Sequence, residues 1–177
     1  MPELPRTAGS QRIDALLRAL GGAVSWLWLA LIGVIVANVV LRYVFSSGRV
    51  EFEELQWHLY ALGILCGLSY CVEADAHVRV DVLRERLSPH MRAWIELYGI
   101  LLLLLPFNAL VVIFGLPFAW ESWQSGEISA SPGGLPYRWL IKSALPLGFA
   151  LLALASFSRL LRVGALLFGD APGREDA

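Results

Sequence analysis

Charged residues are scarce in this chain. Only 16% of its 177 residues are Asp, Glu, Lys or Arg, against about 25% in ordinary soluble domains. Apolar and aromatic residues make up 57%, and the mean hydropathy is +0.62. This composition excludes an intrinsically disordered chain and a coiled coil. The net charge of −1 gives no basic field that would recruit nucleic acid. The composition therefore indicates a membrane protein.

Cysteine and histidine are also rare. The two cysteines, Cys66 and Cys71, are too few for a disulfide framework, and their spacing matches no zinc-binding pattern. Of the three histidines, only His58 lies inside a long apolar run. A haem held between helices would need two axial histidines at matching depths. We therefore expect neither a metal nor a cofactor, and no catalytic residues.

The apolar residues fall into four long runs. They predict transmembrane helices at about 20–41, 54–72, 93–120 and 139–161, because a hydrocarbon core of about 30 Å needs about 20 helical residues. The runs are continuous rather than alternating, which excludes a β-barrel and favours helices. The first run is longer than the apolar region of a signal peptide and has no cleavage motif after it, so we expect it to be retained. The fold class expected for residues 1–177 is a single all-α integral membrane domain.

The arginines predict the orientation of these helices. Ten of the 14 basic residues lie in the two tails and the loop between the second and third helices, and four lie in the other loops or beside them. Because cytoplasmic loops carry the excess of Lys and Arg, both termini are expected in the cytoplasm. Between the second and third helices, apolar residues at helical spacing predict a short amphipathic segment in the membrane interface. The tails, 1–10 and 170–177, are expected to lack regular structure.

Ionisable residues near the helix ends are the candidates for specific contacts. We predict that His58 and Gln56 form hydrogen bonds between helices near the outer surface. Glu96 follows Arg92 by four residues, which favours an ion pair at the interface. Lys142 is expected to extend its side chain toward the headgroups.

The middles of the helices carry little chemistry. Most are Leu, Val, Ile and Ala, and the sequence has no nucleophile–base pair, phosphate-binding loop or metal cluster. Small residues four apart, such as Gly63 and Gly67, predict close packing of helices. From the residues alone, this is a membrane scaffold or a subunit of a larger assembly.

Several loop and helix-end segments resemble one family, the small membrane subunit (DctQ-like) of tripartite ATP-independent periplasmic (TRAP) transporters. The most specific segments are R-Y-V-F followed by E-E-L, then H-V-R-V-D. Two others, Q-W-H-L-Y and P-G-G-L-P-Y-R-W, are similar to the branch often described as the mannitol/chloroaromatic type. The resemblance covers residues 12–165. Phe52 stands where the family usually has Trp, and Ala155 stands where that branch often has Gln.

The resemblance implies a part rather than a complete transporter. Family members pair with a large membrane subunit in the bacterial inner membrane, which carries sodium and solute by an elevator motion. A periplasmic solute-binding protein delivers the solute, here expected to be an organic acid or a polyol. The small subunit acts as a fixed brace and is not an enzyme. On this reading Arg42, Glu53 and Glu54 organise the outer helix ends, and local capping is the alternative. His77, Arg79 and Asp81 would organise the cytoplasmic loop, and a solvated charged turn is the alternative.

Two other classes remain open. One is a small four-helix membrane enzyme of the MAPEG type, which would need arginines facing the bilayer interior to hold an anionic cofactor. The other is a free-standing membrane interaction protein, although no soluble module is attached.

Overall fold

All regular structure in the described part of the chain is helical. The computed structural model describes residues 5, 7–76 and 87–169. Four helical segments are long and apolar enough to cross a membrane: Ala8–Tyr43, Val50–Glu73, Pro89–Gln124 and Trp139–Phe168. The predicted class, an all-helical membrane protein with four spans, is confirmed.

Helix α1 (Ala8–Tyr43) begins well before its apolar run. The Thr7 hydroxyl accepts a hydrogen bond from the Ser10 amide at 3.2 Å, and the Ser10 hydroxyl accepts one from the Thr7 amide at 3.1 Å. This reciprocal capping satisfies amide groups that a helix start otherwise leaves unpaired. Residues 8–10, which the sequence placed in a tail, therefore form the first turn of α1.

The third span is divided into three parts. Helix α4 (Pro89–Tyr98) leads into a π-helical turn, η1 (Gly99–Leu104), and then into α5 (Leu105–Gln124). The Ser88 side chain caps α4, accepting a hydrogen bond from the Met91 amide at 3.3 Å. Pro106 accounts for the π turn, because a proline has no amide hydrogen and its ring collides with the carbonyl four residues earlier in an α-helix.

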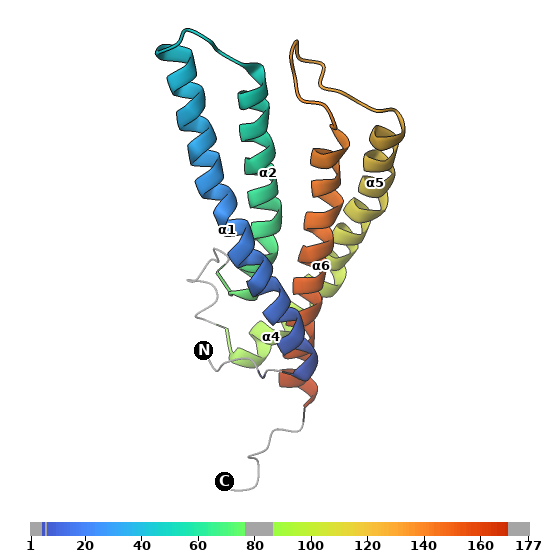
Figure 1. The fold of residues 1–177 in the computed structure, drawn as a ribbon. Helices are drawn as coiled ribbons and strands as arrows, with labels where there is room; N and C mark the ends of the chain where they lie inside the picture. Colours follow the sequence, from blue (N-terminus) through green and yellow to red (C-terminus); the bar gives the residue numbers. More distant parts are fainter. Residues whose placement is uncertain (1–4, 6, 77–86, 170–177) are drawn as a thin grey trace, which may run out of the picture.

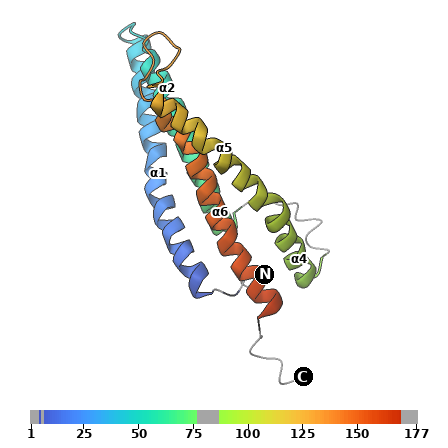
Figure 2. The same cartoon turned by 90° about the vertical axis from the view of Figure 1, so that its right-hand side faces the viewer.

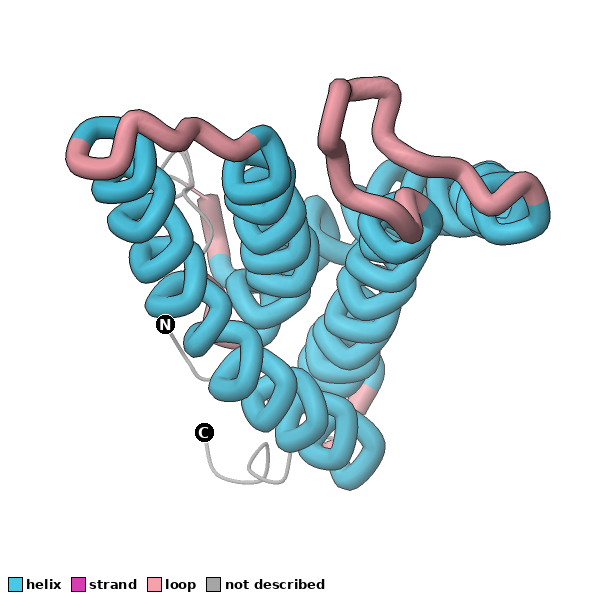
Figure 3. Tube along the Cα trace, turned by 45° about the horizontal axis from the view of Figure 1, so that its top comes forward, coloured by secondary structure: helices cyan, strands magenta, loops and turns pink. Residues whose placement is uncertain are grey.

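The helices form a single layer at one end of the molecule. Helices α1, α2 (Val50–Glu73), α6 (Trp139–Phe168) and α5 stand side by side in that order, as Figure 1 and the view in Figure 3 show. We call this the loop end, because the 44–49 and 125–138 connections lie there. Toward the opposite, terminal end, α1 crosses to contact α6, and Figure 2 shows α1 and α4 on opposite sides of α6.

Helix α6 contacts each of the other three spans. Buried residues make up 33% of the most apolar 18-residue stretch of α6, against 6% of the corresponding stretch of α1. Glycines bring its neighbours close: a Cβ added at Gly148 would lie 2.7 Å from Leu65 of α2, and one at Gly115 of α5 would lie 3.2 Å from Pro146. Leu17, Val72, Leu152 and Ala155, from α1, α2 and α6, form the apolar core. Helix α6 therefore holds the other three spans in place.

Candidate functional site

The loop end joins α1 to α2 by an ion pair. Arg42 in the last turn of α1 contacts Glu53 in the first turn of α2, and both side chains are about half exposed. An exposed pair of this kind contributes about 0.2–1 kcal/mol to stability. The pair lies on either side of the short 44–49 connection between the two helices.

Glu54 faces a different neighbour from Glu53. Its carboxylate accepts hydrogen bonds from the Ser129 hydroxyl and, at 2.7 Å, from the Leu135 amide. Successive residues point about 100° apart around a helix, so Glu53 and Glu54 face different neighbours. Gly134 permits this contact, because a Cβ there would lie 2.5 Å from the Ser129 Cβ. Glu54 thus fastens the α5–α6 loop to the start of α2.

Glu127 binds the same loop to α6. It forms ion pairs with Lys142 and with Arg138, the latter at 3.5 Å. The Lys142 ammonium also lies 4.1 Å from the centre of the Phe118 ring, a cation–π contact with α5. The hydrogen bond from Lys142 is the largest influence lowering the pKa of Glu127. Lys142 therefore has protein partners at the loop end.

A cleft of about 600 Å³ lies between α2, α6 and the loop at this end. Glu53, Glu54, Trp57 and His58 contribute to its lining, together with Arg138. His58 Nδ1 lies 2.5 Å from the Glu54 carbonyl oxygen, so this nitrogen carries the proton and the hydrogen bond stays within α2.

Gln56, which was predicted to act beside His58, is not among the residues that line the cleft. Gln56 lies within α2 and is half-buried. His77, Arg79 and Asp81 lie outside the described residues, as does most of the predicted amphipathic segment.

A second polar cluster lies at the terminal end, where α1 meets α6. Asp14 is only 3% exposed, and its two carboxylate oxygens accept from Ser158, at 2.7 Å, and from Arg162. A buried carboxylate is stable only when it is paired and hydrogen-bonded, and this one is both.

Arg159 extends the cluster to α2 and α4. It is 6% exposed, lies 2.8 Å from Asp75 just after α2, and forms an ion pair with Glu96 of α4. The sequence led us to expect Arg92 as the partner of Glu96, but this contact joins residues 63 positions apart. Helical spacing cannot reveal such a partner.

Sequence reasoning treated these arginines only as markers of orientation. It missed that Asp14, Ser158 and Arg162 form a buried site. One signal was available: Ser158 and Arg162 are four residues apart and share a helix face, while Asp14 shares a face with Leu17 and Ser10 of α1.

The described residues offer little else for chemistry. Within residues 5, 7–76 and 87–169, no group of three or more His, Cys, Asp or Glu side chains is placed to hold a metal ion. Cys66 and Cys71 are free thiols. Both polar clusters hold helices together.

Comparison with known proteins points to one family. Residues 31–165 match the family model described as the DctQ component of tripartite ATP-independent periplasmic transporters. A putative TRAP transporter small permease protein of Haemophilus influenzae (strain ATCC 51907 / DSM 11121 / KW20 / Rd) is 30% identical over 110 residues, covering 62% of this chain and 68% of that protein.

A second relative is much longer. The sialic acid TRAP transporter permease protein SiaT of Haemophilus influenzae (strain 86-028NP) is 29% identical over 134 residues, 76% of this chain. This chain matches only 20% of the length of that permease. No solved structure matches. With a family model that covers most of its length, the chain belongs to the DctQ family, the small permease component of TRAP transporters.

Proposed function

We propose that the chain braces a large membrane subunit during sodium-driven solute uptake, with a periplasmic binding protein delivering the solute. The observation that carries this proposal is the placement of the polar contacts. They lie at the two ends of the layer and join all four spans, while the exposed middles of the spans are apolar. Such a layer is suited to staying fixed while a partner moves against it.

The length of the sialic acid permease supports a large partner. The region similar to this chain is only 20% of the length of that permease, so most of that protein has no counterpart here. We propose that the partner of the present chain is a large membrane subunit in the bacterial inner membrane.

The proposed orientation places the terminal end in the cytoplasm and the loop end in the periplasm. The loop that Glu54 and Glu127 fasten, residues 125–138, would then face the side on which a solute-binding protein arrives. Its fastening keeps that surface in one conformation.

Reconstitution tests the brace directly. The large subunit and the binding protein are placed in liposomes with an inward sodium gradient, with and without this chain, and uptake of labelled solute is measured. We expect uptake to be lost without the chain and to return when the chain is included. Full sodium-driven uptake in its absence would disprove the proposal.

A further inference from the structure

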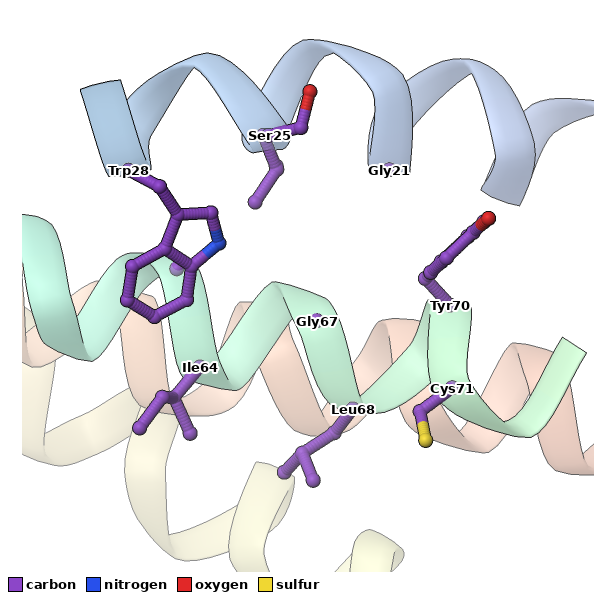
Figure 4. A pocket seen from close by; sticks show the side chains of 10 residues that line it. Gly21, Ser25, Trp28, Ile64, Gly67, Leu68, Tyr70 and Cys71 are labelled. Atoms are coloured by element: carbon purple, nitrogen blue, oxygen red, sulfur yellow. The ribbon is translucent and has the colours of Figure 1, made fainter. Parts of the chain in front are cut away.

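Hollows between the helices differ in what their walls offer to a ligand. The hollow between α1 and α2, about 390 Å³ and shown in Figure 4, is lined mostly by apolar side chains and glycines, and no residue in its lining is charged. Its Ser25 hydroxyl donates to the Gly22 carbonyl at 2.6 Å. The loop-end cleft of about 600 Å³ is lined by charged, aromatic and apolar residues together. The walls of this second hollow can therefore recognise a specific ligand.

The lining of the loop-end cleft changes from polar to apolar along α2. Glu53 lies at its outer end, near Arg138 at the start of α6, whereas Ala61 and Ile141 lie deeper. Glu53 and Ala61 are eight residues apart, about 12 Å along the helix axis. Each headgroup layer of a bilayer is about 5–8 Å thick, because the whole bilayer measures about 40–45 Å and its hydrocarbon core about 30 Å. The cleft is therefore long enough to extend through the headgroup layer into the hydrocarbon.

Aromatic side chains indicate that the cleft lies at the depth of the headgroups. Trp57 and Tyr60, both in the lining, are 70% and 46% exposed. At the neighbouring helix ends, Trp123 and Trp139 pack edge to face with ring centres 4.5 Å apart. Trp and Tyr are enriched at the two membrane–water interfaces, because each has an apolar ring and a polar group. A phospholipid headgroup is therefore a ligand that reaches this cleft without leaving the membrane.

Arg138 has hydrogen-bonding capacity left for a phosphate. Its guanidinium makes two long contacts, 3.5 Å to Glu127 and 3.4 Å to the Ser129 hydroxyl, and its side chain stays 42% exposed. A guanidinium has five N–H donors, so these contacts leave donors for another acceptor. Arginine binds phosphate oxygens through pairs of parallel hydrogen bonds. Arg138 is therefore suited to hold a lipid phosphate at the edge of the cleft.

Acceptors on α2 line the same cleft. The Glu53 carboxylate stays 45% exposed although it pairs with Arg42. Because Nδ1 of His58 carries the proton that meets the Glu54 carbonyl, Nε2 of this ring is left as an acceptor. A carboxylate and an imidazole nitrogen both accept hydrogen bonds from a primary ammonium, whereas a quaternary ammonium has no N–H to donate. The cleft thus offers donors for a phosphate and acceptors for an ammonium.

The charges around the cleft disfavour a ligand that is only an anion. Among the lining residues, their ion-pair partners and one glutamate beside the loop, four carboxylates face three basic groups: Glu51, Glu53, Glu54 and Glu127 against Arg42, Arg138 and Lys142. A free phosphate ion or an anionic lipid gains nothing from this surplus of negative charge. A headgroup that carries its own ammonium beside its phosphate matches both signs of charge.

We propose that the loop-end cleft binds a phospholipid with a phosphoethanolamine headgroup. Its phosphate lies against Arg138, and its ammonium lies near Glu53 and Nε2 of His58. The acyl chains then follow the α2–α6 seam past Ala61 and Ile141. The inference does not depend on the proposed function, because every group that it uses belongs to this chain.

Native mass spectrometry of the full chain in mild detergent tests the choice of headgroup. The chain is titrated with phosphatidylethanolamine, phosphatidylcholine and phosphatidylglycerol that have the same acyl chains, and the fraction carrying each lipid is measured. We expect phosphatidylethanolamine to bind about tenfold more tightly than the other two, because it alone offers both a phosphate and ammonium hydrogens. Equal binding of either competitor would overturn the proposal. Displacement of the lipid by inorganic phosphate would overturn it too, since the cleft would then be a site for a free anion.

Variants locate the bound lipid. Arg138→Gln removes the phosphate contact, and its matched control, Arg49→Gln, removes an exposed arginine at the same end but outside the lining. We expect Arg138→Gln to bind phosphatidylethanolamine about tenfold more weakly and Arg49→Gln to bind it like the unmodified chain. Ala61→Phe fills the deeper part of the cleft without changing a charge, so it should weaken binding as well.

Melting temperature checks that each variant is folded. Unchanged lipid binding by folded Arg138→Gln and Ala61→Phe would overturn the site. Loss of the lipid when the chain is purified together with a large membrane subunit would also overturn it, because a protein segment would then occupy the cleft.

Discussion

Arg159 illustrates how one charged side chain can organise a largely apolar molecule. It is almost fully buried, and it contacts two carboxylates. Asp75 lies just after α2, and Glu96 lies on α4. Burying a charge is costly, and a buried ion pair often adds little net stability. Removing Arg159 is different, because the part-buried Glu96 carboxylate then loses its ion-pair partner.

Replacing this arginine should therefore destabilise the fold strongly. We expect Arg159→Ala to lower the free energy of unfolding by about 1–3 kcal/mol, since the part-buried Glu96 carboxylate loses its ion pair and Asp75 loses one contact. The measurement is denaturant unfolding of the chain in detergent micelles, followed by circular dichroism. Arg12→Ala is the matched control, because Arg12 is exposed on α1 and a surface change is expected to stay within about 0.5 kcal/mol. Equal effects of the two variants would contradict the prediction.

Glu127 makes the stability of the loop end depend on pH. Its pKa is lowered chiefly by the hydrogen bond from Lys142, so folding favours the ionised carboxylate. A group whose pKa is lower in the folded state stabilises the protein above its unfolded pKa, and this contribution is lost as the pH falls through the lowered value.

We therefore expect Glu127→Gln to have a lower melting temperature than the unmodified chain at neutral pH. Below the lowered pKa of Glu127 the two should melt together. Glu121→Gln, at an exposed position of α5, serves as the control for loss of a surface carboxylate. A difference for Glu127→Gln that persists unchanged in acid would mean that the charge of Glu127 is not its source.

At the scale of the helix, the π turn sets which way α4 faces. The Leu105 amide bonds to the Ile100 carbonyl, five residues back, so the turn contains one residue more than an α-helix would. One residue corresponds to about 100° of rotation. The π turn therefore helps to direct Glu96 toward Arg159.

Replacing Pro106 should weaken the contact between Glu96 and Arg159. In Pro106→Ala the amide hydrogen returns and the ring clash is gone, so the α register becomes available. We expect the coupling between Glu96 and Arg159, measured by a double-mutant cycle on unfolding free energy, to fall from about 0.5–3 kcal/mol toward zero. Pro117→Ala, within α5 but away from the π turn, should leave the coupling intact. Unchanged coupling in Pro106→Ala would mean that packing, and not Pro106, holds the register.

For the whole molecule, the distribution of basic residues predicts which end faces the cytoplasm. Ten of them lie in the tails and the loop between α2 and the third span, so the terminal end should stay inside. With single cysteines introduced for labelling, Ser47→Cys and Ser125→Cys at the loop end should react with a membrane-impermeant maleimide in intact cells. Gln11→Cys and Gly169→Cys should react only after permeabilisation. The reverse pattern would invert the orientation, and the unmodified chain controls for its native thiols.

The sequence predicted the number of spans because the bilayer imposes it. A hydrocarbon core of fixed thickness demands long apolar runs, and those runs are visible in the composition of the chain. The order of the helices in the layer was not predictable. Lipid-facing and helix-facing surfaces are both apolar here, so no pattern distinguished the central position of α6 from the peripheral position of α1.

The polar contacts were predictable only in part. The sequence placed Arg42 and the pair Glu53 and Glu54 near each other, because one connection joins their helices. Which glutamate meets the arginine depends on helix rotation, and the structure assigns Glu53 to Arg42 and Glu54 to the loop. The partners of Asp14 and Glu96 lie on α6, far along the chain, so local spacing could mark polar residues on one helix face but could not pair them across helices.

The contacts of α6 also bear on the order in which the subunit can assemble during synthesis. The ribosome makes Asp14, Asp75 and Glu96 first, whereas Arg159 and Arg162, which neutralise them, lie on the last span. During synthesis these three carboxylates are therefore made before the arginines of α6 that they contact. A chain interrupted before residue 159 would keep the Arg42–Glu53 ion pair between α1 and α2, but it would lack every contact that the arginines of α6 make with the other three spans.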